Sequence, residues 1–175
     1  PAGPRFEQTS NNGCSHMLEH MLFRGTPEHP SAHALAVAIE RLGGTLYGAT
    51  YTDHGHMSVT LPSETFERGL ELFAHVVTQP VFADMDVERG IIREEILEGL
   101  DEDGQCIEPD NLTRAVMFPS HPLGMPITGT LATLDTLGET VLRQHHARLY
   151  TANHAVLCIA GPIEATALGN VAEIG

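Results

Sequence analysis

The stretch NNGCSHMLEHMLFRGT, residues 11–26, sets the organisation of this chain. Polar residues lead directly into an apolar segment with helical periodicity, which predicts a helix from about Cys14 to Phe23. Asn11 or Asn12 is the expected N-cap, because a side-chain oxygen at that position can accept a hydrogen bond from the first turn. This helix also carries a residue pattern that is typical of metal binding.

Within the predicted helix, His16 and His20 are four residues apart, so both imidazoles can face one cation. Imidazole is a common ligand of Zn²⁺. Glu19 borders the same position and can act as a general base toward a water molecule whose pKa zinc lowers to about 7. The order His-x-x-Glu-His inverts the better-known His-Glu-x-x-His motif. The alternative is that the three residues face solvent on an amphipathic helix, and a third ligand would distinguish the two interpretations.

A candidate third ligand comes from a second helix, predicted from about Asp84 to Asp103. At about 100° per residue, Glu88 and Glu95 fall within an apolar stripe, whereas Glu94 falls on the opposite side. The stripe consists of Val87, Ile91, Ile92 and Ile96. Carboxylates on an apolar face are costly unless they are paired or bind a cation. We therefore expect Glu95 to complete the metal site and Glu88 to orient a ligand or tune its charge. The alternative is that the two glutamates are partly exposed, or that they form a salt bridge with arginine.

The remaining sequence predicts one hairpin and several more helices. Strands are expected at residues 45–51 and 56–61, with a turn at residues 53–55, and a buried strand at residues 154–160. Further helices are expected at residues 31–42, 64–79, 111–118, 131–137, 139–150 and from about 164 onward, the second of these capped by Ser63. This order is typical of an α+β fold with helices packed on a mostly antiparallel sheet. A sheet of only two or three strands is marginal for a domain of 175 residues. We therefore expect further strands of the sheet to lie outside this chain.

Composition excludes several classes of function. The formal net charge of −14 is incompatible with general nucleic-acid binding, which needs clustered Lys and Arg. No apolar run reaches about 18 residues, so no membrane span is expected. The cysteines, Cys14, Cys106 and Cys158, match neither a disulfide framework nor a Cys-x-x-Cys metal site, which favours reduced thiols and a cytoplasmic setting.

Taken together, these motifs resemble the pitrilysin/insulysin family of metallopeptidases, which includes mitochondrial processing peptidase. Residues 11–26 are similar to the family signature around His-x-x-Glu-His. Glu88-Arg89 through Glu95-Ile96 matches the family pattern E-R-x-x-x-x-x-E-I, and Glu95 follows His20 by 75 residues. IERLGGTLYGATYT (39–52) resembles the family's Gly-Gly and following strand, and LYTANHAVLCIAGPIE (149–164) the strand that closes the domain.

The resemblance implies a zinc endopeptidase domain over residues 1–175, acting on peptides or unfolded segments. It implies that His16, His20 and Glu95 bind Zn²⁺, that Glu19 is the base and that Glu88 assists. A substrate peptide would add as an extra strand at an edge near residues 46–51. Family members pair two homologous halves or subunits, so a homo- or heterodimeric partner is expected. The family's opening strands and second half are absent here, and Tyr47 stands near a position where the family usually has Asn.

Two other interpretations remain open. Some family members are non-catalytic structural or binding subunits, although these generally lose part of His-x-x-Glu-His, which is intact here. The second alternative is a purely structural zinc site without catalysis. Such sites usually have four protein ligands, often Cys, whereas the only cysteine near His16 in the sequence is Cys14. His54, His56, His145 and His146 are expected to be surface or core residues without a metal role, and Cys14 a packed thiol.

Overall fold

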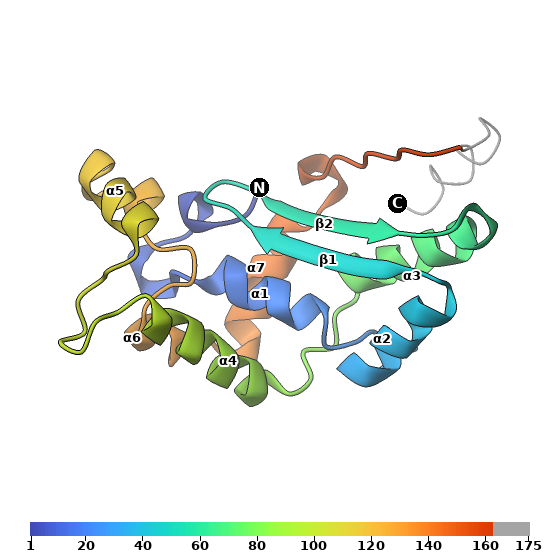
Figure 1. The fold of residues 1–175 in the computed structure, drawn as a ribbon, viewed down its shortest axis with the longest axis horizontal. Coiled ribbons are helices and arrows are strands. Elements are labelled where there is room, and N and C mark those ends of the chain that lie inside the picture. Colours follow the sequence, from blue (N-terminus) through green and yellow to red (C-terminus); the bar gives the residue numbers. More distant parts are fainter. Residues whose placement is uncertain (163–175) are drawn as a thin grey trace.

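The computed structural model describes residues 1–162 and confirms the α+β class. Its helices are α1 (Cys14–Leu22), α2 (Ala32–Arg41), α3 (Phe66–Thr78), α4 (Met85–Glu98), α5 (Pro109–Met117), α6 (Leu131–Leu134) and α7 (Glu139–Leu149) (Figure 1). Strands β1 (Thr45–Thr50) and β2 (Gly55–Thr60) form an antiparallel hairpin. Single 3-10 turns lie at Pro4–Phe6, Thr9–Asn11, Ser63–Thr65, Pro122–Gly124 and Ala152–His154.

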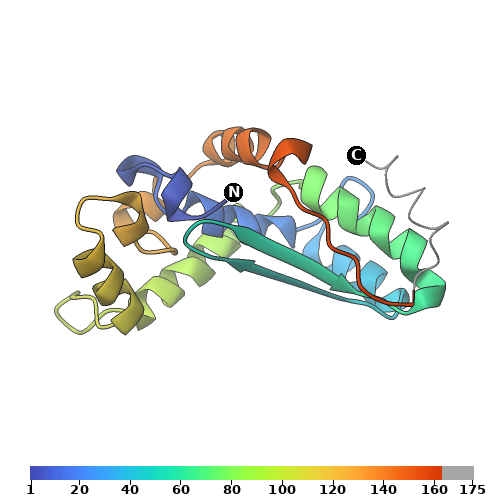
Figure 2. The ribbon, with the colours of Figure 1, turned by 90° about the horizontal axis from the view of Figure 1, so that it is seen from above.

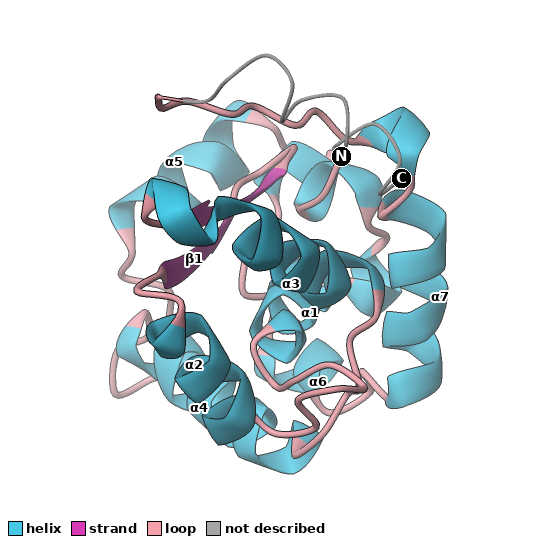
Figure 3. Cartoon of the chain, turned by 90° about the vertical axis from the view of Figure 1, so that its right-hand side faces the viewer, coloured by secondary structure: helices cyan, strands magenta, loops and turns pink. Residues whose placement is uncertain are grey.

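Helix α1 lies at the centre of the fold. The hairpin covers one side of it and α7 the opposite side, as Figure 2 shows, while α4 packs along a third side. Figure 3 looks at the molecule from the end, with α1 in the middle of the surrounding helices. Its buried residues are Cys14, Ser15, Met17, Leu18, Met21 and Leu22. Burial of most of the helix fixes the direction of the few side chains that remain partly open, His16, Glu19 and His20.

Two apolar clusters form the core and meet at α1. One joins α1 to α4, α6 and α7, and its fully buried members include Met17, Leu18, Ile92 and Leu142. The other joins the end of α1 to α2 and α3 through Leu22, Leu35, Ile39, Leu72 and Val76. Burial of large aliphatic side chains contributes about 1.5–3 kcal/mol each relative to exposure, so α1 is held mainly by these contacts.

The hairpin approaches α1 with one face of β1. Alternation along the strand turns Leu46, Gly48 and Thr50 toward the helices, whereas Tyr47 on the other face is exposed. Gly48 makes the close approach possible, because a Cβ there would lie 2.9 Å from a ring carbon of Phe23. The strand can therefore bring side-chain oxygens within hydrogen-bonding distance of α1.

The predicted N-cap of α1 is wrong. The N-cap residue is Gly13, and neither Asn11 nor Asn12 caps the helix through its side chain. The buried carboxylate of Glu7 takes this role, since it accepts hydrogen bonds from the backbone N–H groups of Gly13 (2.8 Å) and Ser15 (2.7 Å). An anion at a helix N-terminus is also favoured by the helix dipole, and this one comes from a preceding turn that local sequence rules do not consider.

Other boundaries differ from prediction in detail. Ser31 caps α2, accepting from Ala34 N–H at 3.2 Å. Ser63 does not cap α3, which begins only at Phe66 after a 3-10 turn. Helix α4 ends at Glu98 rather than Asp103, because Asp101 Oδ1 accepts from two following backbone N–H groups and closes a turn instead.

The predicted buried strand at residues 154–160 is also wrong. His154 ends a 3-10 turn, residues 155–160 are loop in the structure (Figure 1), and Val156 is 90% exposed. An apolar segment becomes a β-strand only when its backbone pairs with the edge strand of a sheet. Among the described residues, the sheet contains β1 and β2, and this segment pairs with neither. The helix predicted from about residue 164 lies outside the described residues.

Two observations on residues 1–162 concern apolar helices and cysteines. No helix there is both long and apolar enough to cross a bilayer. All three cysteines are free thiols: Cys14 is buried, Cys106 partly buried and Cys158 exposed. Burial, with the Glu7 carboxylate nearby, raises the pKa of the Cys14 thiol to about 12, so it is a packed thiol rather than a nucleophile.

Helix α7 holds the start of α1 through a buried histidine. His145 Nε2 lies 2.8 Å from Ser15 Oγ, and Arg148 Nη2 lies 3.2 Å from His145 Nδ1. Because an arginine can only donate, Nδ1 is the acceptor and Nε2 carries the proton. Burial first, then the charges of Arg148 and His146, lower the pKa of His145 to about 4. The neutral form of this imidazole is therefore part of the folded structure.

A pH dependence follows from His145. Between pH 6.5 and about 4, the His145 imidazole is protonated in the unfolded chain but stays neutral in the folded chain. The free energy of unfolding therefore falls as pH falls. When the pH is lowered from 7 to 5, the free energy of unfolding of the wild type should fall by about 2 kcal/mol more than that of His145→Gln. The measurement is urea unfolding with a chelator present. The exposed His33→Gln should keep the wild-type dependence, and an unchanged dependence in His145→Gln would contradict the assignment.

Candidate metal centre

Side chains from α1 and α4 converge at one point. His16 and His20 project from successive turns of α1, and Glu95 faces them from α4. His16 Nε2 lies 3.6 Å from Glu95 Oε2, and His20 Nε2 lies 3.8 Å from Glu95 Oε1. One ligand atom of each residue lies within 4.8 Å of the other two, and within residues 1–162 no other group of three His, Cys, Asp or Glu residues meets this criterion. The structure thus brings together the three residues predicted from the sequence as metal ligands.

This set fits a zinc ion by its donor chemistry. Two imidazole nitrogens and one carboxylate oxygen are the protein ligands of many catalytic zinc sites, which leave a fourth position open. The three donor atoms lie within 4.8 Å of one another, so small side-chain shifts would bring all of them to the roughly 2.0–2.2 Å at which zinc ligands lie from the metal. A fourth protein donor is not part of the group.

Glu88 fixes the tautomer of His20. Its Oε2 lies 2.7 Å from His20 Nδ1, so Nδ1–H donates to the carboxylate and Nε2 keeps its lone pair on the side of Glu95. Arg24 Nε lies 2.6 Å from the other oxygen of Glu88 and balances its charge. Glu88 is only 8% exposed, and a carboxylate buried to this extent is costly unless it is paired. The contacts with His20 and Arg24 provide that pairing.

His16 is held differently. Its Nδ1 is buried without a hydrogen-bond partner in the described part of the chain. Burial, and secondarily the neighbouring His20, lower the pKa of His16 to about 3, so its imidazole is neutral at physiological pH. The two rings meet edge to face, with centroids 4.7 Å apart. A neutral ring with an available Nε2 is the state in which histidine binds a metal.

Negative charge accumulates around these imidazoles. Burial raises the pKa of Glu95, the charges of Glu19, Glu88 and Glu98 raise it further, and His20 acts in the opposite direction. Carboxylates that repel one another in a partly desolvated position favour a bound cation. The electrostatics therefore agree with the donor geometry.

Glu19 lies beside the group without joining it. Its Oε2 accepts a hydrogen bond of 2.8 Å from Thr50 Oγ1 at the end of β1. The side chain is partly buried, and its second oxygen makes no hydrogen bond to a described residue. A carboxylate with one oxygen anchored and one free can accept a proton from a water molecule nearby.

Sequence reasoning missed two residues of this network. Arg24 follows His20 by four positions, so the same helical spacing that paired the histidines could have indicated it. Thr50 gave no comparable signal, because its contact with Glu19 depends on how the hairpin lies against α1. Part of the predicted apolar stripe on α4 is also wrong: Ile92 and Ile96 are buried, but Val87 and Ile91 are 55% and 44% exposed.

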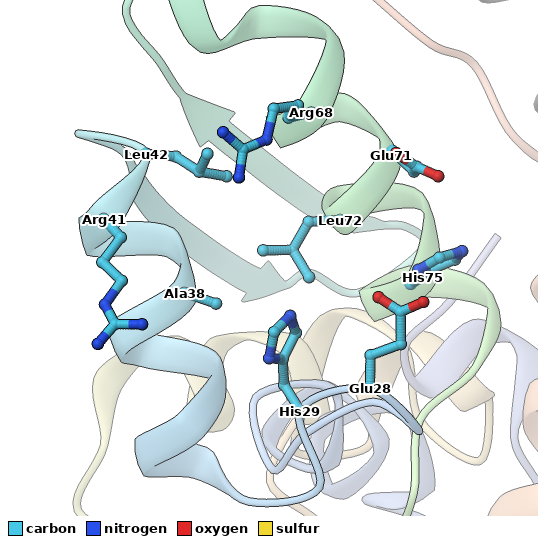
Figure 4. A pocket seen from close by; sticks show the side chains of 9 residues that line it. All are labelled: Glu28, His29, Ala38, Arg41, Leu42, Arg68, Glu71, Leu72 and His75. Carbon is cyan, nitrogen blue, oxygen red and sulfur yellow. The ribbon is translucent and has the colours of Figure 1, made fainter.

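Other candidate residues lie apart from the group. His54 and His56 are exposed on the hairpin, and His146 Nε2 bonds the carbonyl oxygen of Val77 in α3. A concavity of about 300 Å³ lies between α2 and α3 (Figure 4). Its lining includes Arg41, Arg68, Glu71, Leu72 and His75, and none of the residues around Glu95 contributes to it. The concavity has no part in the metal centre.

Comparisons with known proteins place this geometry in context. The family model described as insulinase, peptidase family M16, matches residues 1–131. A protein of Mycobacterium leprae described as an uncharacterized zinc protease is 30% identical over 164 residues, covering 93% of this chain and 36% of its own length. Mitochondrial-processing peptidase subunit beta of Caenorhabditis elegans is 28% identical over 174 residues, covering 98% of this chain and 37% of its own.

Solved structures share the fold at lower identity. A protease from Helicobacter pylori superposes with a TM-score of 0.84 at 20% identity, covering 99% of this chain and 41% of that one. Pitrilysin superposes with a TM-score of 0.71 at 21% identity, covering 87% of this chain and 17% of that one. The chain thus spans little more than a third of the length of the curated relatives that it matches.

Metal binding can be tested by substitution on α4. We expect one Zn²⁺ per chain by native mass spectrometry, lost in Glu95→Gln, because two imidazoles alone hold the ion too weakly. His16→Ala and His20→Ala should lose it as well. The matched control is Glu94→Gln, since Glu94 is exposed one position earlier on the same helix. Loss of zinc in Glu94→Gln with retention in Glu95→Gln would refute the assignment.

Proposed function

The chain belongs to the insulinase family of peptidases, M16, and on this premise we propose that it is the zinc-binding catalytic part of an endopeptidase. Its substrates are peptides or unfolded segments. The observation that carries the proposal is the meeting of His16, His20 and Glu95 with a partly buried carboxylate, Glu19, beside them. Relatives described as zinc proteases support the same assignment.

Each residue has one role in this proposal. His16 and His20 offer Nε2, and Glu95 offers a carboxylate oxygen, to a single Zn²⁺. Bound zinc supplies Lewis acidity, which polarises a peptide carbonyl and lowers the pKa of a water molecule. Glu88 holds His20 in the tautomer that leaves Nε2 free, and Arg24 pairs with the other oxygen of Glu88.

Glu19 moves the proton. As a water oxygen forms its bond to the carbonyl carbon, one water proton passes to the free oxygen of Glu19. The same carboxyl group then returns this proton to the amine nitrogen as the C–N bond breaks. The hydrogen bond from Thr50 to one oxygen of Glu19 restricts where that proton acceptor lies.

The alternatives predict different ligand sets. A structural zinc site would require a fourth protein donor, and the group contains three. A non-catalytic subunit would have no need of an ionisable base at the position of Glu19. The intact His-x-x-Glu-His sequence and the location of Glu19 favour catalysis over both.

A partner half is part of the proposal. The chain spans little more than a third of its curated relatives, and one of them is a subunit of mitochondrial-processing peptidase. Holding a peptide and stabilising a developing oxyanion require donors beyond the metal. Arg24, the cation nearest to His20 along the helix, is already paired with Glu88. A second homologous half or subunit is the proposed source of the missing donors.

The role of Glu19 separates chemistry from binding. Glu19→Gln in the complete protein should retain zinc but lower kcat by about 10² to 10⁴, because the amide keeps the shape and cannot accept a proton. The readouts are peptide hydrolysis and metal content on the same sample. Near-normal turnover with zinc bound would eliminate Glu19 as the base and leave the metal assignment intact.

The need for a partner can be tested on this chain alone. The zinc-loaded 175 residues should cleave an unstructured peptide at least about 10² more slowly than the complete protein, because oxyanion donors and substrate contacts are lost. Adding the rest of the polypeptide or its partner subunit should restore the rate. Full activity from this chain alone would show that a second half is unnecessary.

A further inference from the structure

The hydrogen bond between β1 and Glu19 points to a function for a residue that has none assigned. We propose that Thr50 is a positioning residue that fixes the general base. This role rests on the proposed peptidase function: the Thr50 hydroxyl binds one oxygen of Glu19, so that the other oxygen faces the reacting water. The contact is Thr50 Oγ1 to Glu19 Oε2 at 2.8 Å.

The base needs such a restraint because of its side chain. Glutamate has three rotatable bonds, and its carboxylate can swing by more than an ångström without any change in α1. A displacement of about 1 Å of a catalytic group costs about 10² in rate. Glu19 is partly exposed, so packing alone does not fix it, and Thr50 is its hydrogen-bond donor among the described side chains.

The hairpin makes Thr50 a rigid donor. Thr50 is the last residue of β1 and pairs with Gly55 in the ladder, and the turn is closed by Tyr51 N–H donating to His54 O at 2.8 Å. Arg5 N–H donates to Thr52 O at 3.0 Å and ties the N-terminal turn to the same place. The close approach at Gly48, two residues before Thr50, sets the spacing between β1 and α1.

The Thr50 hydroxyl determines which oxygen of Glu19 is available to accept a proton. The Thr50 hydroxyl hydrogen is directed at Oε2, so that oxygen is occupied and Oε1 retains the lone pair that takes the water proton. Thr50 itself neither gains nor loses a proton during the reaction. Removing the hydroxyl therefore affects the rate of the proton-transfer step and leaves the metal ligands in place.

Kinetics of matched variants test this role in the complete, zinc-loaded protein. Thr50→Val, which keeps the shape and lacks the hydroxyl, should lower kcat by about 10- to 100-fold with KM little changed and zinc content normal. Thr50→Ser should restore most of the rate, because it retains a donor. In a Glu19→Gln background, Thr50→Val should have little further effect, since the base is already absent.

Thr60→Val is the control for the hairpin. Thr60 lies at the exposed end of β2, opposite Thr45, and its hydroxyl bonds no described residue. This variant should keep wild-type kcat. A Thr50→Val enzyme with normal kcat and bound zinc would overturn the proposal, as would a folded, zinc-loaded Thr50→Ser enzyme as slow as Thr50→Val.

A second readout does not depend on activity. In urea unfolding of the metal-free protein, Thr50→Val and Glu19→Ala should together shift the midpoint by less than the sum of their separate shifts, whereas Thr60→Val and Glu19→Ala should add. Additive shifts for Thr50 and Glu19 would overturn the contact. An inactive wild type would instead refute the proposed peptidase function and the catalytic part of this inference, while the unfolding cycle would still decide the contact.

Discussion

The packing of several partly buried carboxylates beside two imidazoles is the constraint around which the metal site is organised. Glu19, Glu88 and Glu95 converge on the two imidazoles of α1, and one arginine, Arg24, is paired with one of these carboxylates. Desolvation and like charges raise the pKa of Glu95, so the group is least stable without positive charge among its ligand atoms. A divalent cation offsets that repulsion, which explains why residues costly to bury have been gathered in one place.

Contacts outside the site fix the helix that carries these residues. Glu7 satisfies the first N–H groups of α1, His145 bonds Ser15 beside His16, and the core clusters cover the rest of the helix. None of these residues lies close enough to bind the metal, yet they fix the helix on which its ligands stand. Precise sites depend on such support, because ligands and bases must be held within a fraction of an ångström of their working geometry.

Local patterns predicted the helices and the shared face of His16 and His20, because helical periodicity determines which side chains of one helix lie together. The selection of Glu95, which the structure brings to these histidines, rested on the second helix's apolar stripe and on the family resemblance. They failed where a distant partner decides the structure. Glu7 replaces the expected asparagine cap, and Val156 stays exposed because an apolar run needs a neighbouring strand. Thr50 could not be found from spacing at all, since only the packing of β1 on α1 brings it to Glu19. The roles of the site residues remain predictions that the geometry supports.

The central claim is that His16, His20 and Glu95 bind one catalytic zinc ion with a coordination position left open. Anomalous diffraction at the zinc edge, from crystals of the metal-loaded complete protein, tests it most directly. We expect a single peak at this group, within about 2.0–2.2 Å of His16 Nε2, His20 Nε2 and a Glu95 oxygen, with Glu19 outside the bonded set. A peak elsewhere on this chain, or one here with a fourth protein ligand that closes the site, would contradict it.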